Sequence, residues 1–158
     1  MMKRLSFAGL AVAASLVLSG CASVNMASKE ESTQAKEFKQ PAAGQAGLYI
    51  YRNSFVGQAL KKDVWLDDNC IGESANNVFF YTQVPGDKAY KIATESEFSP
   101  NTFETTLAAG KNHFFRQYIK MGVFVGGANI EAVSEEQGKK DVAQLEMAKM
   151  GSCSGTKK

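Results

Sequence analysis

Residues 62–73, KDVWLDDNCIGE, are the stretch of sequence that decides the fold. The first half alternates, so that Val64 and Leu66 would face one side of a strand and Trp65 the other. The turn-forming cluster Asp67-Asp68-Asn69 follows, and residues 70–73 then read as a returning strand. The stretch therefore predicts a β-hairpin.

Further short segments on both sides of this hairpin are rich in β-branched and aromatic residues. The turn signals Pro85-Gly86-Asp87 and Ala109-Gly110-Lys111-Asn112 separate some of them. The predicted strands outside the hairpin are residues 47–52, 78–84, 88–94, 102–107, 113–120 and 129–133. Short strands without helices between them predict a mainly β protein, built as an antiparallel β-sandwich or barrel.

The end of the chain has a different, helical character. Residues 134–137, SEEQ, have the form of a capping box, and residues 139–150 contain good helix formers. Gly138 would cost about 1 kcal/mol inside a helix, so the C-terminal helix is expected to start after it. Gly151 would close the helix, and residues 150–158 would form a tail.

Residues 22–46 precede the first strand and are rich in Ala, Ser, Lys, Glu and Gln, with Phe38 as their single aromatic residue. Such a stretch buries too little apolar surface to offset its ordering entropy, which predicts a flexible tether spanning roughly 25–30 Å. The alternative is a short helix over residues 32–39. The predicted folded domain is residues 47–149.

The N-terminus has the organisation of a signal peptide, with Lys3 and Arg4 followed by an almost wholly apolar run over residues 7–18. As a helix the run would span about 18 Å, which is short of a hydrocarbon core of about 30 Å. Residues 18–21, LSGC, resemble the lipobox of bacterial lipoproteins. That resemblance implies cleavage after residue 20 and lipid attachment to Cys21, with residues 21–46 forming the lipidated cysteine and tether.

The residue after Cys21 is Ala22 and not Asp, which by resemblance to enteric sorting rules implies the outer membrane of the cell envelope. The alternative is a secreted protein that has a cysteine at its cleavage site by chance. The chain has 18 basic and 16 acidic residues, and removal of Lys3 and Arg4 would balance them. This balance gives no reason to expect a nucleic-acid partner or a polybasic membrane anchor.

The strand pattern resembles the DUF2846 family of bacterial lipoproteins, whose domain has no known function. The resemblance rests on GLYIYR at 47–52, VWLD at 64–67, Ile71-Gly72, VPG at 84–86, AGKNHFFR at 109–116 and VSEE at 133–136. Similar motifs occur in PEGA-type and carboxypeptidase-regulatory-like sandwiches. The resemblance implies a compact β-sandwich and no activity.

Few residues suggest catalysis or metal binding. His113 is the single histidine, and it lies beside two phenylalanines in a predicted strand, where a structural role is expected. Asp67-Asp68-Asn69 lacks the spacing of a calcium loop. The glycines at 122, 126 and 127 form no phosphate-binding fingerprint. We therefore expect no catalytic residues, no cofactor and no metal.

Two further features leave alternatives open. Arg52 and Arg116 each close an aromatic strand, where they would be edge charges or, alternatively, a paired anion-binding site. Residues 121–127, MGVFVGG, are expected to form a core strand bent by glycines, and the alternative is an exposed apolar loop that contacts a partner or membrane.

Lipidation of Cys21 would leave Cys70 and Cys153, an even pair in an oxidising compartment. A disulfide between them would join the C-terminal tail to the first hairpin. Two free thiols are the alternative.

These features favour a membrane-anchored, non-enzymatic envelope lipoprotein that binds a protein or a glycan. A structural or stress-related surface lipoprotein without a specific ligand is the alternative, and an enzyme built from dispersed residues is a third hypothesis.

Overall fold

The computed structural model of the chain describes residues 23–155. The predicted signal peptide (1–20) and the lipidation site at Cys21 therefore lie outside the described residues. Within the described range, no helix is both long enough and apolar enough to cross a membrane.

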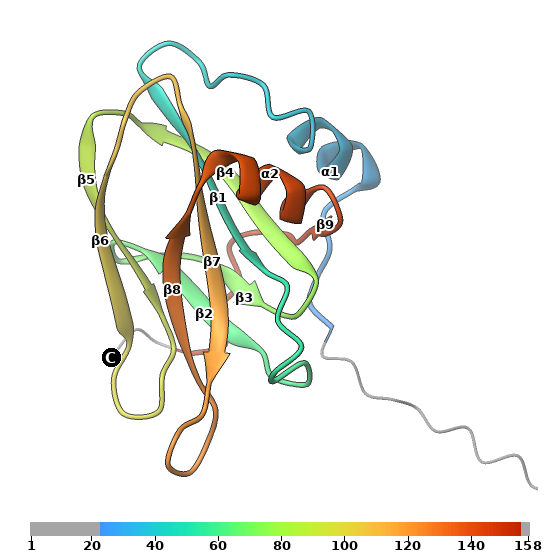
Figure 1. Cartoon of the computed structure of the whole chain (residues 1–158), viewed down its shortest axis with the longest axis vertical. Helices are drawn as coiled ribbons and strands as arrows, with labels where there is room; N and C mark the ends of the chain where they lie inside the picture. The colour runs from blue at the N-terminus through green and yellow to red at the C-terminus, as the bar shows by residue number, and fades with distance from the viewer. Residues whose placement is uncertain (1–22, 156–158) are drawn as a thin grey trace, which may run out of the picture.

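Two β-sheets pack face to face, and Figure 1 shows their strands. The five-stranded sheet has the order β8-β7-β1-β4-β9, and the four-stranded sheet has the order β3-β2-β5-β6. The strands are β1 (Gln45–Arg52), β2 (Lys62–Leu66), β3 (Asn69–Ser74), β4 (Val78–Pro85), β5 (Lys88–Thr94), β6 (Asn101–Leu107), β7 (Asn112–Lys120), β8 (Gly127–Val133) and β9 (Glu146–Met147). All eight predicted strands are present and the mainly β sandwich is confirmed.

The five-stranded sheet is mixed and not purely antiparallel. β1 pairs antiparallel with β4 but parallel with β7, and the short β9 pairs parallel with β4. A parallel pair requires a long crossover, and here the chain between β1 and β7 builds the whole four-stranded sheet. The first strand of the sandwich is therefore central to its larger sheet.

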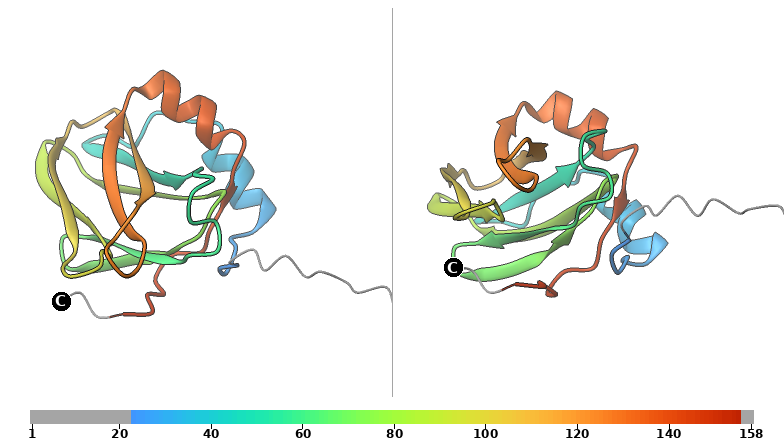
Figure 2. Two further views of the ribbon diagram at one scale, coloured as in Figure 1. Left: turned by 60° about the horizontal axis from the view of Figure 1, so that its bottom comes forward. Right: turned by 90° about the horizontal axis from the view of Figure 1, so that it is seen from below.

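Alternation along β1 separates two apolar clusters. Leu48 and Ile50 face the main core between the sheets, whereas Tyr49 and Tyr51 face the outer side of the five-stranded sheet. The two helices cover that outer side (Figure 2), which explains why almost every residue of β1 is buried.

The prediction of a flexible tether is wrong, because residues 23–46 pack on the sandwich. Helix α1 (Lys29–Ala35) begins at a capping box, in which Ser28 Oγ accepts from the Glu31 amide and the Glu31 carboxylate accepts from the Ser28 amide. The helix starts and ends earlier than the alternative helix over 32–39 would. Its Ala35 is buried in the outer apolar cluster, and Val24 packs against the main core.

The C-terminal helix is present but its predicted bounds are wrong. Helix α2 (Glu135–Val142) begins at the N-cap Ser134 and contains Gly138 in its interior. A Cβ at Gly138 would lie 2.2 Å from Cγ of Phe114, so the absence of a side chain permits close packing on β7. Beyond the helix, Glu146 and Met147 join the sheet as β9.

The predicted tail also belongs to the folded unit. Gly151 donates its amide to the carbonyl of Ile71, and Ser152 accepts from the amide of Glu73, so residues 151–152 extend along the edge strand β3. The disulfide between Cys70 and Cys153, with Cα atoms 6.1 Å apart, fastens the same segment. The folded domain is therefore residues 23–155, wider than the predicted 47–149.

Candidate functional site

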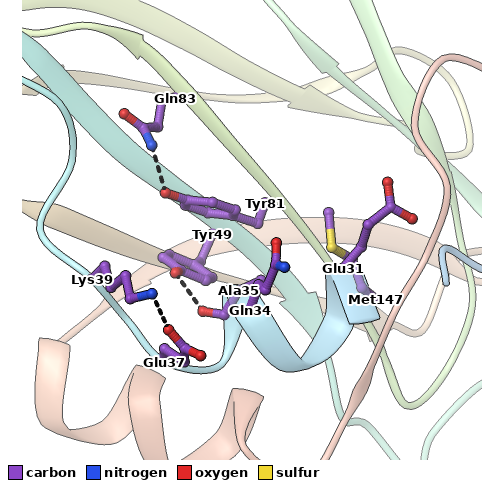
Figure 3. A pocket seen from close by; sticks show the side chains of 9 residues that line it. All are labelled: Glu31, Gln34, Ala35, Glu37, Lys39, Tyr49, Tyr81, Gln83 and Met147. Atoms are coloured by element: carbon purple, nitrogen blue, oxygen red, sulfur yellow. Dashed lines mark hydrogen bonds and ion pairs between the residues drawn. The ribbon is translucent and has the colours of Figure 1, made fainter. Parts of the chain in front are cut away.

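A groove of about 410 Å³ lies on the outer side of the five-stranded sheet, beside α1. Figure 3 shows the tyrosines of neighbouring strands β1 and β4 on its floor and polar side chains around them. The residues that line it come from α1 and the turn after it, from two central strands and from β9: Glu31, Gln34, Ala35, Glu37, Lys39, Tyr49, Tyr81, Gln83 and Met147.

An aromatic stack forms the rigid floor of the groove. The ring of Tyr49 lies between Tyr81, at 4.4 Å between ring centroids, and Phe114, at 4.7 Å. Tyr49 also donates its hydroxyl to the carbonyl of Ala35 at 2.8 Å, which fixes the end of α1 to the sheet. Tyr49 is buried and Tyr81 half-buried, so Tyr81 presents the accessible aromatic surface.

The polar groups of the groove suit hydrogen bonding more than acid–base catalysis. Gln83 donates to the hydroxyl of Tyr81 at 3.1 Å and accepts from the amide of Ala42. Glu31 is held by the Ser28 amide, which lowers the pKa of its carboxyl group, and Glu37 pairs with Lys39. An ionised carboxylate accepts hydrogen bonds but is a poor general acid. The groove offers an aromatic face with amides and carboxylates, a combination that fits a glycan or peptide.

This groove could not be predicted directly from the sequence, because its residues come from distant segments. One local signal was present: Ser28-Lys29-Glu30-Glu31 has the capping-box spacing that predicts a helix start inside the supposed tether. That helix forms one wall of the groove.

We expect the protein to lose stability as the pH rises above about 10, the ordinary pKa of tyrosine. Burial is the main cause that raises the pKa of both Tyr49 and Tyr51 well above that value, and the hydrogen bond from Tyr51 to Asp141 adds to it for Tyr51. Above about pH 10 the unfolded chain releases protons that the folded chain retains, so each tyrosine lowers the free energy of unfolding by about 1.4 kcal/mol per pH unit.

Urea unfolding at several alkaline pH values measures this slope. The Tyr49→Phe/Tyr51→Phe double variant should have a shallower slope than the wild type. An equal slope in both proteins would contradict the assignment to these two hydroxyls.

The hypothesis of a paired anion site at Arg52 and Arg116 is wrong. Arg116 is in register with Tyr51 across β1 and β7, so Arg52, the next residue, points to the opposite side of the sheet. Arg52 is fully buried and donates to the carbonyl oxygens of Leu60, at 2.7 Å, and Gly57. Arg116 forms an ion pair with Glu131 on the neighbouring strand.

His113 and Asp67, the other polar candidates in the sequence, both have structural contacts. The Nε2 atom of His113 lies 3.2 Å from the carbonyl oxygen of Ala108. Asp67 stands at the turn between β2 and β3, and its carboxylate accepts from the amide of Lys91 at 2.9 Å. Among residues 23–155, no group of three or more His, Cys, Asp or Glu side chains is placed to hold a metal ion.

The expectation of a core strand at residues 121–127 is wrong. β7 ends at Lys120 and β8 begins at Gly127, and the residues between them form an exposed loop. Phe124 is 83% exposed in this loop, and the carboxylate of Glu97 accepts hydrogen bonds from the amides of Val123, Phe124 and Val125. A side chain from the β5–β6 connection thus satisfies backbone donors that would otherwise pair in a sheet.

The protein is therefore a small β-sandwich domain. On the outer side of its five-stranded sheet, Tyr49 and Tyr81 form the floor of a groove that α1 borders. The chain belongs to the DUF2846 family, described as proteins of unknown function, and the family's sequence profile matches residues 42–128. It is also 56% identical over 137 residues to a protein of Haemophilus influenzae (strain ATCC 51907 / DSM 11121 / KW20 / Rd), described as an uncharacterized protein. This match covers 87% of the chain and 81% of that protein. No solved structure matches the chain.

Proposed function

We propose that this protein is a non-enzymatic envelope lipoprotein, anchored to the outer membrane by lipid on Cys21, that binds a protein or glycan partner in the groove beside α1. The observation that carries the binding role is the accessible ring of Tyr81, stacked on Tyr49 and surrounded by amides and carboxylates. A rigid aromatic surface contributes contact area at low entropic cost, and polar neighbours orient the ligand.

The composition of the groove supports a binding role over an enzymatic one. Among residues 23–155, none of those that line it is a Ser, Cys or His that would serve as a nucleophile or as the base of a triad. Its two carboxylates are already engaged, Glu31 by the helix N-terminus and Glu37 by Lys39. These contacts leave the groove suited to holding a ligand.

The anchor predicts a clear difference between two cysteine variants. The wild type should fractionate with membranes and carry acyl mass, because two or more acyl chains give stable anchoring. Cys21→Ala should carry no acyl mass and remain an uncleaved precursor or become soluble. The Cys70→Ser/Cys153→Ser variant, which keeps Cys21, should remain acylated and serves as the control. A wild-type protein without acyl mass would refute the anchor.

The binding groove can be tested in intact cells with a photo-crosslinking residue at Gln34, which is exposed on the wall of the groove. Crosslinking there should give a discrete adduct that a Tyr81→Ala variant loses. The same residue at Thr106, exposed on β6 in the other sheet, is the matched control. Identical patterns at both positions, or none at Gln34, would refute the groove and favour a lipoprotein without a specific ligand.

A further inference from the structure

The exposed apolar side chains of the described chain gather at one end of the sandwich. Of the nine large hydrophobic side chains that are exposed in residues 23–155, seven belong to the β1–β2, β5–β6 and β7–β8 loops. Phe55 is 87% exposed, Phe98 76% and Phe124 83%, one in each loop. Figure 1 shows all three loops at the lower end. Exposed apolar side chains that gather at one place on a protein mark a contact with a partner or a membrane more often than scattered ones do.

The three loops are held in place against one another. Glu97 in the β5–β6 loop accepts from three amides of the β7–β8 loop, among them Val123 at 2.6 Å. Burial pushes the pKa of Glu97 upward, but these three hydrogen bonds together outweigh it and lower the pKa. A Cβ at Gly126 would lie 2.8 Å from Leu60, so the β1–β2 loop also touches the β7–β8 loop. The loops therefore present their aromatic tips on a fixed support.

The short connection from Cys21 to the folded domain favours a membrane surface as the occupant of this patch. Val24 already packs against the main core. Only three residue steps separate it from Cys21, and a fully extended chain of that length spans at most about 11 Å. The described chain begins in the same half of the molecule as the loops (Figure 1). A lipid on Cys21 thus keeps this half of the domain at the bilayer surface.

From these observations, and on the basis of the proposed lipid anchor, we infer that the three loops insert Phe55, Phe98 and Phe124 into the interface of the membrane that holds the lipid. An amphipathic helix at a membrane surface buries its apolar face about 5–10 Å into the boundary of headgroups and acyl chains, and we expect the aromatic tips of the loops to reach a comparable depth. The carboxylate of Glu97 does not oppose insertion as a bare charge would, because backbone amides already solvate it. Lys120, the exposed last residue of β7, precedes the β7–β8 loop directly and would meet lipid phosphates on insertion.

Tryptophan fluorescence of the full-length lipidated protein in vesicles of phosphatidylethanolamine and phosphatidylglycerol tests this inference. The native Trp65 is buried and gives a constant background. Phe124→Trp should show blue-shifted emission and lose most of its added intensity when the lipids carry bromine on their acyl chains. The control is Lys111→Trp, which stands exposed in the turn between β6 and β7 at the opposite end and should not be quenched.

The outcomes separate this inference from the proposed anchor, because acyl mass is measured on the same preparation. Acylated Cys21 with an unquenched Phe124→Trp overturns the insertion of the loops and leaves the anchor standing. A blue shift without quenching by brominated lipid also overturns insertion and indicates that a second copy of the protein covers the patch. Absence of acyl mass overturns both proposals.

Discussion

Replacing Cys70 and Cys153 together by serine is expected to lower the free energy of unfolding by about 4–5 kcal/mol, on the chain-entropy account of a loop that closes over 83 residues. The disulfide acts on a segment that has few other anchors. Besides the disulfide, residues 151–152 exchange two backbone hydrogen bonds with Ile71 and Glu73. The amides of Ser154 and Gly155 donate to the carboxylate of the buried Asp63. Small domains are stable by only about 5–15 kcal/mol in total, so this loss is severe.

Urea unfolding of the double variant against the wild type measures the effect. Cys21→Ala, which leaves the disulfide intact, is the matched control and should unfold as the wild type does. Alkylation of two thiols in the unreduced, denatured wild type would contradict the presence of the bond.

The second large effect concerns two arginines that stand in similar places in the sequence but in opposite environments. Arg52→Ala should lower the free energy of unfolding by about 3–5 kcal/mol, because it leaves a cavity at a fully buried position and leaves the half-buried carbonyl groups of Gly57 and Leu60 without their donor. Burial lowers the pKa of Arg52 to about 10, so the side chain remains charged at neutral pH. Arg116→Ala should cost only about 0–1 kcal/mol, since its ion pair with Glu131 is partly exposed.

A third variant, Arg52→Met, should have an unfolding free energy between those of Arg52→Ala and Arg116→Ala. Arg52→Met fills most of the space without a charge, so it should cost about 1–3 kcal/mol for the carbonyl oxygens left unpaired. Hydrogen exchange of the β1–β2 loop should accelerate in both Arg52 variants and not in Arg116→Ala. Equal unfolding energies for Arg52→Ala and Arg116→Ala would refute the structural role of Arg52.

The sandwich could be predicted from the sequence because the patterns that predict its strands and turns involve only residues that are neighbours in the chain. Alternation along residues 62–66 and the turn at Asp67 are set by neighbouring residues, and all eight predicted strands are present. The bounds of α2 could not be predicted in the same way. Gly138 weakens a helix in isolation, but its packing against Phe114, a residue on β7, makes it favourable in the folded chain.

The groove and the apolar loops required tertiary information for the same reason. Residues 29–35 lack the apolar stripe of an independent helix, and Ala35 and Phe38 become part of a core only through Tyr49 and Phe114. The run at 121–127 has the composition of a buried strand. It forms an exposed loop because the carboxylate of Glu97, a residue more than twenty positions earlier, accepts hydrogen bonds from its backbone amides.

The first and last segments of the described domain pair with each other, which determines when the fold can be completed. The amide of Lys149 donates to Asn25, the amide of Ala27 donates to Met147, and β1 has β7 as one of its two partners. A ribosome delivers the first of these residues long before the last. Until β7 has been made, β1 lacks one of its two neighbours, and until residues 147–149 have been made, residues 25–27 lack their hydrogen-bond partners. The fold is therefore complete only when nearly the whole domain is present, and a chain truncated before Met147 should remain open to proteases.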